Sequence, residues 1–272
     1  MLHFRFAFLL LILCCCYYHS QSQELFVFSE PASNMPGKSI GVRLNNRITK
    51  ETVSGKANYQ FIPEIMAGVN KRLMLHLETF INNEGNSLKL TGAGAYAKYR
   101  VYSQDKVFRH FRMAVFSRAS ISSSTIKQEE INTFGQNSGY QLGVISTQLL
   151  HKTALSGTVY FEHAYNNMND GALYIPTQRN GINYTLSAGR LLLPKRYTSY
   201  KQVNFNFMAE VLGQVLPSGS KYIDIAPSIQ LIFNSQTRID IGYRQELYSR
   251  LLPRYAPNGV LLRIEHLFFN VY

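Results

Sequence analysis

The sequence predicts an all-β protein, a transmembrane antiparallel up-and-down β-barrel of about 12 strands. Residues 222–272 show the pattern most clearly, because Ile223 and Ile225 share one parity while Asp224 and Gln230 share the other. Such alternation is typical of a strand with one apolar and one polar face. The pattern recurs along the chain in segments of about ten residues or more, joined by alternately short and long connections, which is typical of a barrel that spans a membrane.

Residues 1–22 have the features of a secretory signal peptide. Arg5 precedes an apolar run at 6–16, which is too short for a spanning helix of roughly 20 residues, and the polar stretch 19–22 follows it. The residues before Cys14 lack the small side chain expected of a lipoprotein signal. All three cysteines lie in this leader, so we expect no disulfide, thiolate nucleophile or cysteine metal ligand in the exported chain.

The remaining chain divides into an irregular lead-in and one barrel domain. Residues 23–38 contain Pro31, Pro36 and Gly37, and we expect them to form an irregular segment on the periplasmic side. Residues 39–272 carry the barrel, and no linker or low-complexity tract divides them. The expected strands are 39–46, 58–69, 73–81, 88–102, 107–122, 139–150, 153–165, 181–193, 203–215 and 222–234, then one strand after the turn 235–237 and one after Gly259.

Individual strands are assigned from alternating polarity and from the turn residues at their ends. In the first strand Val42 is expected to face outward and Arg43 inward. Pro63 removes a backbone donor from the second strand and weakens that assignment. Gly92 and Gly94 do not form a phosphate-binding loop, because no helical pattern follows them.

The connections differ in length according to the strand that they follow. Those after odd-numbered strands are mostly long: 47–57, 82–87, 123–137, 166–180, 216–221 and 249–259. Those after even-numbered strands are mostly short: 70–72, 103–106, 151–152, 194–200 and 235–237. Bacterial outer-membrane barrels have an even strand number, long loops on one side and both termini on the short-turn side. We therefore expect the protein in the bacterial outer membrane, in contact with its lipid and lipopolysaccharide.

Closure of the sheet creates a lumen, and parity assigns charged side chains to it. Backbone groups in hydrocarbon must be paired within the protein, so a spanning sheet closes on itself, and a charge turned to lipid at the midplane costs about 2 to 4 kcal/mol. The acidic and basic residues assigned to the lumen are nearly balanced, which predicts ion pairs across it. The expected lumen-lining residues are Arg43, Glu64, His76, Glu78, Lys98, Arg100, Arg112, Arg118, Glu162, Glu210, Asp224, Asp240, Arg244, Glu246, Arg263 and Glu265.

A charged lumen supports two functions. Charges that line a wet path select small polar or ionic solutes by field and diameter, and we expect this porin-like channel. Charges that pair tightly across the lumen fill it instead. The protein is then a structural or accessory barrel with a plugged lumen, which docks other envelope proteins through loops such as 123–137 and 166–180.

Other chemistry has less support in the sequence. The net charge of +12 is spread along the chain rather than clustered, so we expect no nucleic-acid binding. His76 and Glu78 share one strand face, where a hydrogen bond within the lumen is favoured over a bound cation, and we expect neither metal nor cofactor. A lipid hydrolase with a site at 162–167, around His163, needs a serine nucleophile that the spacing does not supply. We therefore expect no enzyme.

Five stretches of the chain, 23–25, 29–35, 63–66, 148–152 and 222–227, carry a resemblance to a group of largely uncharacterised, porin-like outer-membrane β-barrel proteins of the Bacteroidota. The resemblance covers most of the exported length. It implies the fold and the location, and it carries over no site residue. The terminal aromatic Tyr272, with Phe268, is similar to the signal by which barrel-assembly machinery recognises its clients, although Asn270 and His266 stand where apolar residues are usual.

Overall fold

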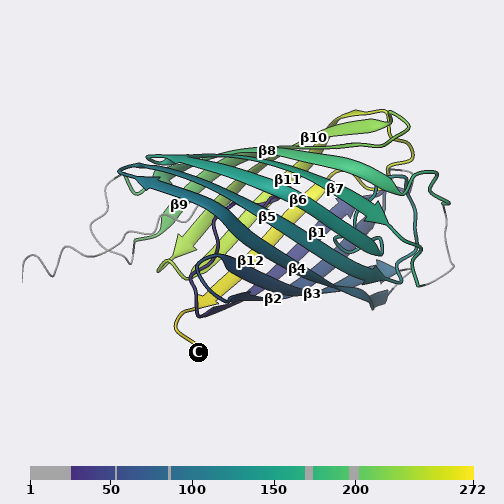
Figure 1. Ribbon diagram of the computed structural model, residues 1–272. Helices are drawn as coiled ribbons and strands as arrows, with labels where there is room; N and C mark the ends of the chain where they lie inside the picture. Colours follow the sequence, from purple (N-terminus) through teal and green to yellow (C-terminus); the bar gives the residue numbers. More distant parts are fainter. Residues whose placement is uncertain (1–25, 53, 85–86, 169–173, 196–201) are drawn as a thin grey trace, which may run out of the picture.

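The computed structural model describes residues 26–52, 54–84, 87–168, 174–195 and 202–272. They form a closed antiparallel barrel of twelve strands, in which β1 (Ser39–Lys50) pairs with β12 (Gly259–Phe268) (Figure 1). The predicted fold class is confirmed, while the expected signal peptide, 1–22, lies outside the described residues. Between β1 and β12 run β2 (Ala57–Gly68), β3 (Leu73–Glu84), β4 (Ser87–Lys106), β5 (Arg109–Ser122), β6 (Gly139–Leu150), β7 (Thr153–Ala164), β8 (Asn180–Leu193), β9 (Asn204–Val215), β10 (Lys221–Phe233) and β11 (Thr237–Ser249).

The barrel wall has an apolar outer face and a polar inner face. Asp224 and Gln230 of β10 are buried on the inner face, at 0% and 1% exposure, and Ile229 is exposed on the outer face. Outward apolar side chains are exposed around the barrel, among them Leu77, Leu90, Leu142, Val159, Leu186 and Ile241. Among the described residues, no helix is long and apolar enough to cross a membrane. An apolar outer surface of this extent is rare on soluble proteins and is the surface that a barrel in lipid requires.

Strand β2 accommodates Pro63 at an interruption of the sheet. The register pairs Phe61 with Ile81 and Glu64 with Glu78, and the two β2 residues between them have no partner on β3. Proline has no N–H to donate, so it fits where the ladder is already broken. β2 therefore continues through Pro63, as the sequence predicts.

Several strands extend beyond their predicted ends. β1 continues to Lys50 rather than ending at residue 46, and this places Arg47 on the inner face with Arg43 and Asn45. β3 and β4 also run on, so the connection between them is shorter than predicted.

Two of the irregular segments that the structure describes lie in the lumen. The first, residues 26–36, is named the plug segment; Phe26, Val27 and Ala32 within it are at most 1% exposed. It was expected at the periplasmic side, and the structure places it inside the barrel, where wall side chains satisfy its backbone polar groups. The second, residues 123–138 between β5 and β6, is named the inner loop, and its Ile131 and Thr133 are also buried.

The plug segment runs close against the backbone of the wall at two glycines. A Cβ atom at Gly68 would lie 2.1 Å from the carbonyl oxygen of Pro36, and one at Gly242 would lie 2.5 Å from a ring carbon of Phe28. Only a residue without a side chain allows this approach. The glycines at positions 68 and 242 of the wall thus leave room for the plug segment.

Candidate functional site

Glu210 on β9 holds the start of the plug segment. Its carboxylate accepts hydrogen bonds from the backbone N–H groups of Val27 (2.8 Å), Phe28 (2.7 Å) and Ser29 (3.0 Å), and from Ser29 Oγ (2.6 Å). The side chain of Glu210 has no exposed surface. Three consecutive N–H donors therefore replace the water that a carboxylate needs.

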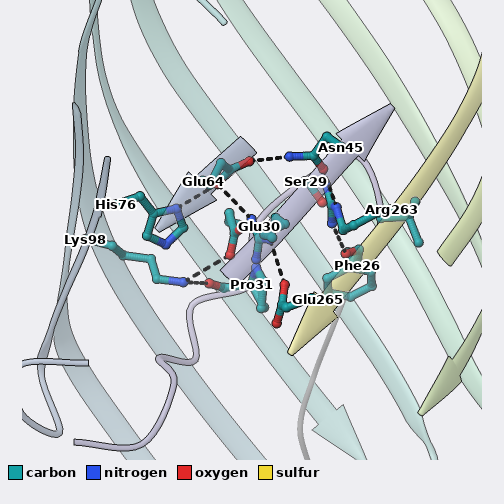
Figure 2. Close-up of polar contacts among 12 residues, drawn as sticks. Phe26, Ser29, Glu30, Pro31, Asn45, Glu64, His76, Lys98, Arg263 and Glu265 are labelled. Atoms are coloured by element: carbon teal, nitrogen blue, oxygen red, sulfur yellow. Dashed lines mark hydrogen bonds and ion pairs between the residues drawn. The ribbon is translucent and has the colours of Figure 1, made fainter. Parts of the chain in front are cut away.

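Lys98 and Glu30 fix the middle of the plug segment (Figure 2). Lys98 Nζ, from β4, donates to the carbonyl oxygens of Pro31 (2.7 Å) and Ser33 (2.8 Å) and lies 3.6 Å from Glu30 Oε2. Glu30 Oε1 also lies 2.5 Å from a guanidinium nitrogen of Arg43 on β1. The segment is thus tied to β1, β4 and β9 at once, so it spans the lumen.

Beneath the plug segment, ion pairs join neighbouring strands. Arg43 Nε lies 2.6 Å from Glu265 Oε2 on β12, and its NH1 atom lies 3.5 Å from Glu64 Oε2 on β2. Glu64 Oε2 is also 3.2 Å from His76 Nδ1, and Glu265 Oε2 is 2.7 Å from Arg238. The structure therefore brings four predicted lumen residues together and adds Arg238, which was missed.

Arg263 and Asp240 extend this network across β11 and β12. Asp240 Oδ2 lies 3.1 Å from Arg238 Nε and 3.7 Å from Arg263 NH1. Arg263 also donates to Asn45 Oδ1 (2.7 Å) and to the carbonyl oxygen of Phe26 (3.3 Å). The plug segment is thus in direct contact with the ion pairs of the wall.

A second charge cluster, near the long loops, holds the inner loop. Arg254, from the β11–β12 connection, pairs with Glu130 of the inner loop (2.9 Å), Asp224 (2.7 Å) and Glu246 (2.7 Å). Arg244 pairs with Asp224 at 2.6 Å and with Glu130 at 3.1 Å. Burial alone raises the pKa of Glu130, but the two guanidinium groups outweigh it and lower that pKa to about 2. Glu130 is therefore a charged anchor.

Glu162 and Gln214 bind the inner loop through hydrogen bonds to its uncharged groups. Glu162 Oε1 accepts from the backbone N–H (2.7 Å) and hydroxyl (2.9 Å) of Thr133, and its Oε2 accepts from Asn183 Nδ2 (2.8 Å). Gln214 accepts from the N–H of Ile131 (3.1 Å) and donates to its carbonyl oxygen (2.8 Å). The predicted lumen residue Glu162 thus holds a loop rather than an opposing charge.

Arg118 and Arg47 lie against one aromatic ring of the inner loop. Their guanidinium carbons are 4.2 and 4.6 Å from the ring centre of Phe134. Arg118 also pairs with Glu78 at 3.1 Å. A cavity of about 210 Å³ lies here, between the plug segment and the inner loop, with Glu30, Arg47, Arg118, Phe134, Tyr160 and Arg244 in its lining. We name it the outer cavity, because its wall residues lie toward the long loops.

The remaining predicted lumen residues lie near the short-turn end. Arg112 donates to Ser33 Oγ at 2.8 Å and pairs with Asp105 at 3.2 Å. Arg100 is half-buried at a bulge of β4 between Arg100 and Tyr102. This end of the lumen thus adds a further contact to the plug segment.

The predicted assembly signal lies at the end of β12. Phe268 is 48% exposed on the outer face, and the Tyr272 hydroxyl donates to the carbonyl oxygen of Gly68 at 3.0 Å. At the stretch considered for hydrolysis, His163 Nδ1 lies 2.6 Å from Asn180 Oδ1. His163 follows Glu162 in one strand, so the two side chains point to opposite faces of the wall.

Three buried side chains have ligand atoms close enough for a metal ion. Those of Glu64, His76 and Glu78 lie within 4.8 Å of one another. Arg43 and Arg118 already pair with the two carboxylates. Their charges disfavour a further cation, so the trio is explained as part of the ion-pair network.

Sequence reasoning missed residues of two kinds. Arg47 lies beyond the predicted end of its strand, so a correct strand end would have found it. Arg238 lies within its predicted strand and shares the parity of Asp240 and Arg244, so alternation alone already places it on the inner face. Glu30, Glu130 and Arg254 lie outside the strands, where no periodicity relates a position in the sequence to a face of the wall. Their place in the lumen follows only from the three-dimensional course of the irregular segments.

No protein-family model matches the sequence, and no curated protein matches it. Solved structures do resemble the barrel. One is the NanC porin, with a TM-score of 0.50 and 11% identity over 85% of this chain and 98% of that chain. Another is an outer membrane channel from Pseudomonas putida F1, with a TM-score of 0.54 and 10% identity over 90% of this chain and all of that chain. At this identity the likeness establishes a shared fold, that of porin-like outer-membrane barrels.

Proposed function

We propose that the protein is a porin-like channel of the bacterial outer membrane for small polar or ionic solutes. Residues 1–22 direct export, and Phe268 and Tyr272 address the barrel-assembly machinery. The barrel then lies among outer-membrane lipid and lipopolysaccharide, as a member of the Bacteroidota barrel group that its sequence resembles. The proposal includes no enzymatic activity.

The observation that carries this proposal is the division of polarity across the barrel wall. Apolar side chains such as Leu77 (67% exposed) and Leu90 (70% exposed) cover the outside, and ionised side chains line the inside. A barrel with this polarity is stable in lipid and surrounds a polar interior. The two resembling structures supply the same fold.

The plug segment makes passage conditional. Because it is tied to several strands, a solute that enters the outer cavity meets the segment as the floor, where Phe28, Ser29 and Glu30 line the cavity. Most of its anchors are hydrogen bonds and ion pairs, which water can replace when the segment moves out. The channel is thus closed at rest and opens by displacement of the plug segment.

The same anchors favour a second candidate, an accessory barrel whose lumen stays plugged. Conductance in planar bilayers separates the two. We expect a variant that lacks residues 26–36 to show larger and more persistent currents than the mature chain, which should open rarely. Circular dichroism and heat-dependent gel mobility establish that the variant is folded. A folded variant without current would overturn the channel function and leave the accessory barrel.

A further inference from the structure

The outer cavity contains three acidic residues, and partners within the protein already engage them. Glu30 pairs with Arg43 at 2.5 Å, and Glu130 pairs with Arg254 at 2.9 Å. Glu162 accepts hydrogen bonds from neutral donors, including the backbone N–H of Thr133. The carboxylates of the cavity are therefore committed to holding the plug segment and the inner loop.

Arg47 differs from the other cavity arginines. Within the described parts of the chain it forms no ion pair with a carboxylate; NH1 donates to Gln60 Oε1 at 3.4 Å, and Nε is buried without a hydrogen-bond partner. Arg118, on the same Phe134 ring, also has a buried Nε without a partner. Leaving a guanidinium group partly buried and uncompensated is costly. An anion bound beside Arg47 would supply the missing opposite charge.

The rest of the cavity lining fits a small organic molecule with hydroxyl groups. Asn132 and Gln136 of the inner loop offer amide N–H donors, and Tyr160 offers an aromatic face. A guanidinium group binds a carboxylate through two parallel N–H donors. The lining thus combines one site for negative charge with neutral groups for the remainder of the solute.

We propose that the outer cavity binds a small carboxylate-bearing solute. The carboxylate of the solute contacts the guanidinium group of Arg47, and Arg118 lies beside it. The inference rests on the proposed function, because it names the class of solute that the channel admits. The inference predicts that the protein binds anionic solutes more tightly than neutral or cationic ones, at a site on the side of the long loops, where the solute enters.

Binding is measured by calorimetry on the mature protein in detergent at low ionic strength, with three sugars of one ring size: glucuronate, glucose and glucosamine. We expect glucuronate to bind at least about tenfold more tightly than the other two, because a charge-assisted hydrogen bond contributes this much or more. Arg47→Gln should lose this preference, and Arg47→Lys should keep part of it. Arg250→Gln, an exposed arginine at the same end of the barrel, is the matched control and should bind like the wild type.

Two results would overturn the inference. One is equal binding of glucuronate and glucose, or no binding of glucuronate at millimolar concentration. The other is an Arg47→Gln variant, shown to be folded by circular dichroism, that binds glucuronate like the wild type. The assay requires no current, so binding without conductance would sink the channel and keep the site. Conductance without binding would overturn the binding site and keep the channel.

Discussion

The buried charges of the lumen serve mainly as anchors for chain segments. Lys98 binds two backbone carbonyl groups, and Glu210 binds three backbone N–H groups. A buried charge is tolerated only when hydrogen bonds or opposite charges replace its water. Here an irregular chain supplies those groups, so each buried ion and the segment it binds stabilise each other.

The buried charge of Glu130 makes the stability of the protein depend on pH. Its pKa is lowered from 4.5 to about 2 by Arg254 and Arg244 against the effect of burial, a shift that corresponds to about 3 kcal/mol. Because the folded pKa is depressed, this stability is present above pH 4.5 and is lost as the pH falls toward 2. We expect Glu130→Gln to lower the free energy of unfolding at pH 7, and the difference from the wild type to shrink to less than half at pH 3. Denaturant titrations in micelles measure both, and an undiminished difference would contradict the assignment.

At the scale of elements, strands and inserted segments are stabilised in different ways. Each strand bonds to two neighbours through its own backbone, as β6 does along its length with β5 and β7. The plug segment and the inner loop have no such ladder and depend on wall side chains. The plug segment is held by side-chain hydrogen bonds, ion pairs and the packing of Phe26 and Val27 against the wall, and a segment held in this way can detach without breaking the backbone ladder of the strands. The plug segment is therefore the element that can move while the wall stays intact.

A disulfide tether tests this motion. Ser29 Oγ of the plug segment lies 2.9 Å from Ser187 Oγ on β8, so cysteines at both positions are within bonding reach, and the chain after the proposed leader has no other cysteine. We expect the oxidised Ser29→Cys, Ser187→Cys protein to show at least about tenfold fewer openings in bilayers than its reduced form, because a covalent bond blocks release of the segment. The single variant Ser29→Cys is the control. Unchanged openings, with the disulfide confirmed by mass spectrometry, would show that the segment does not gate the lumen.

For the whole molecule, the two faces of the wall determine the surroundings in which it is stable. The outer face gains by contact with hydrocarbon, and the inner face carries most of the buried charge. Closure of β1 against β12 leaves no free edge among the twelve described strands, and a sheet in lipid requires such closure. The barrel, the apolar surface and the charged lumen are thus three consequences of one alternating pattern.

Charge scanning of the outer face tests the membrane orientation. Leu77 is 67% exposed in the middle of β3, and Val107 is 83% exposed in the turn beyond β4. We expect Leu77→Arg to destabilise the barrel in lipid vesicles by about 2 to 4 kcal/mol and Val107→Arg by about 0 to 1 kcal/mol, because the cost of a charge falls with distance from the midplane. Denaturant unfolding followed by circular dichroism measures both. Equal costs would contradict a membrane around β3.

The sequence alone determined the wall of this protein. A period of two assigns Ile229 and Ile241 to one face and Asp224 and Asp240 to the other, and turn residues separate the twelve strands; both signals are local, so they can be read without coordinates. The strand ends were less certain, and Arg47 was missed for that reason.

Only the tertiary structure decided what fills the lumen. The plug segment and the inner loop have irregular backbones, so no periodicity predicts their course, and the partners of Glu210 lie more than 180 residues away in sequence. Polar contacts of this kind exist only after the barrel closes and gives the segments a surface to bind. The pattern of side chains therefore determined the barrel, and long-range hydrogen bonding determined that its interior is occupied by its own chain.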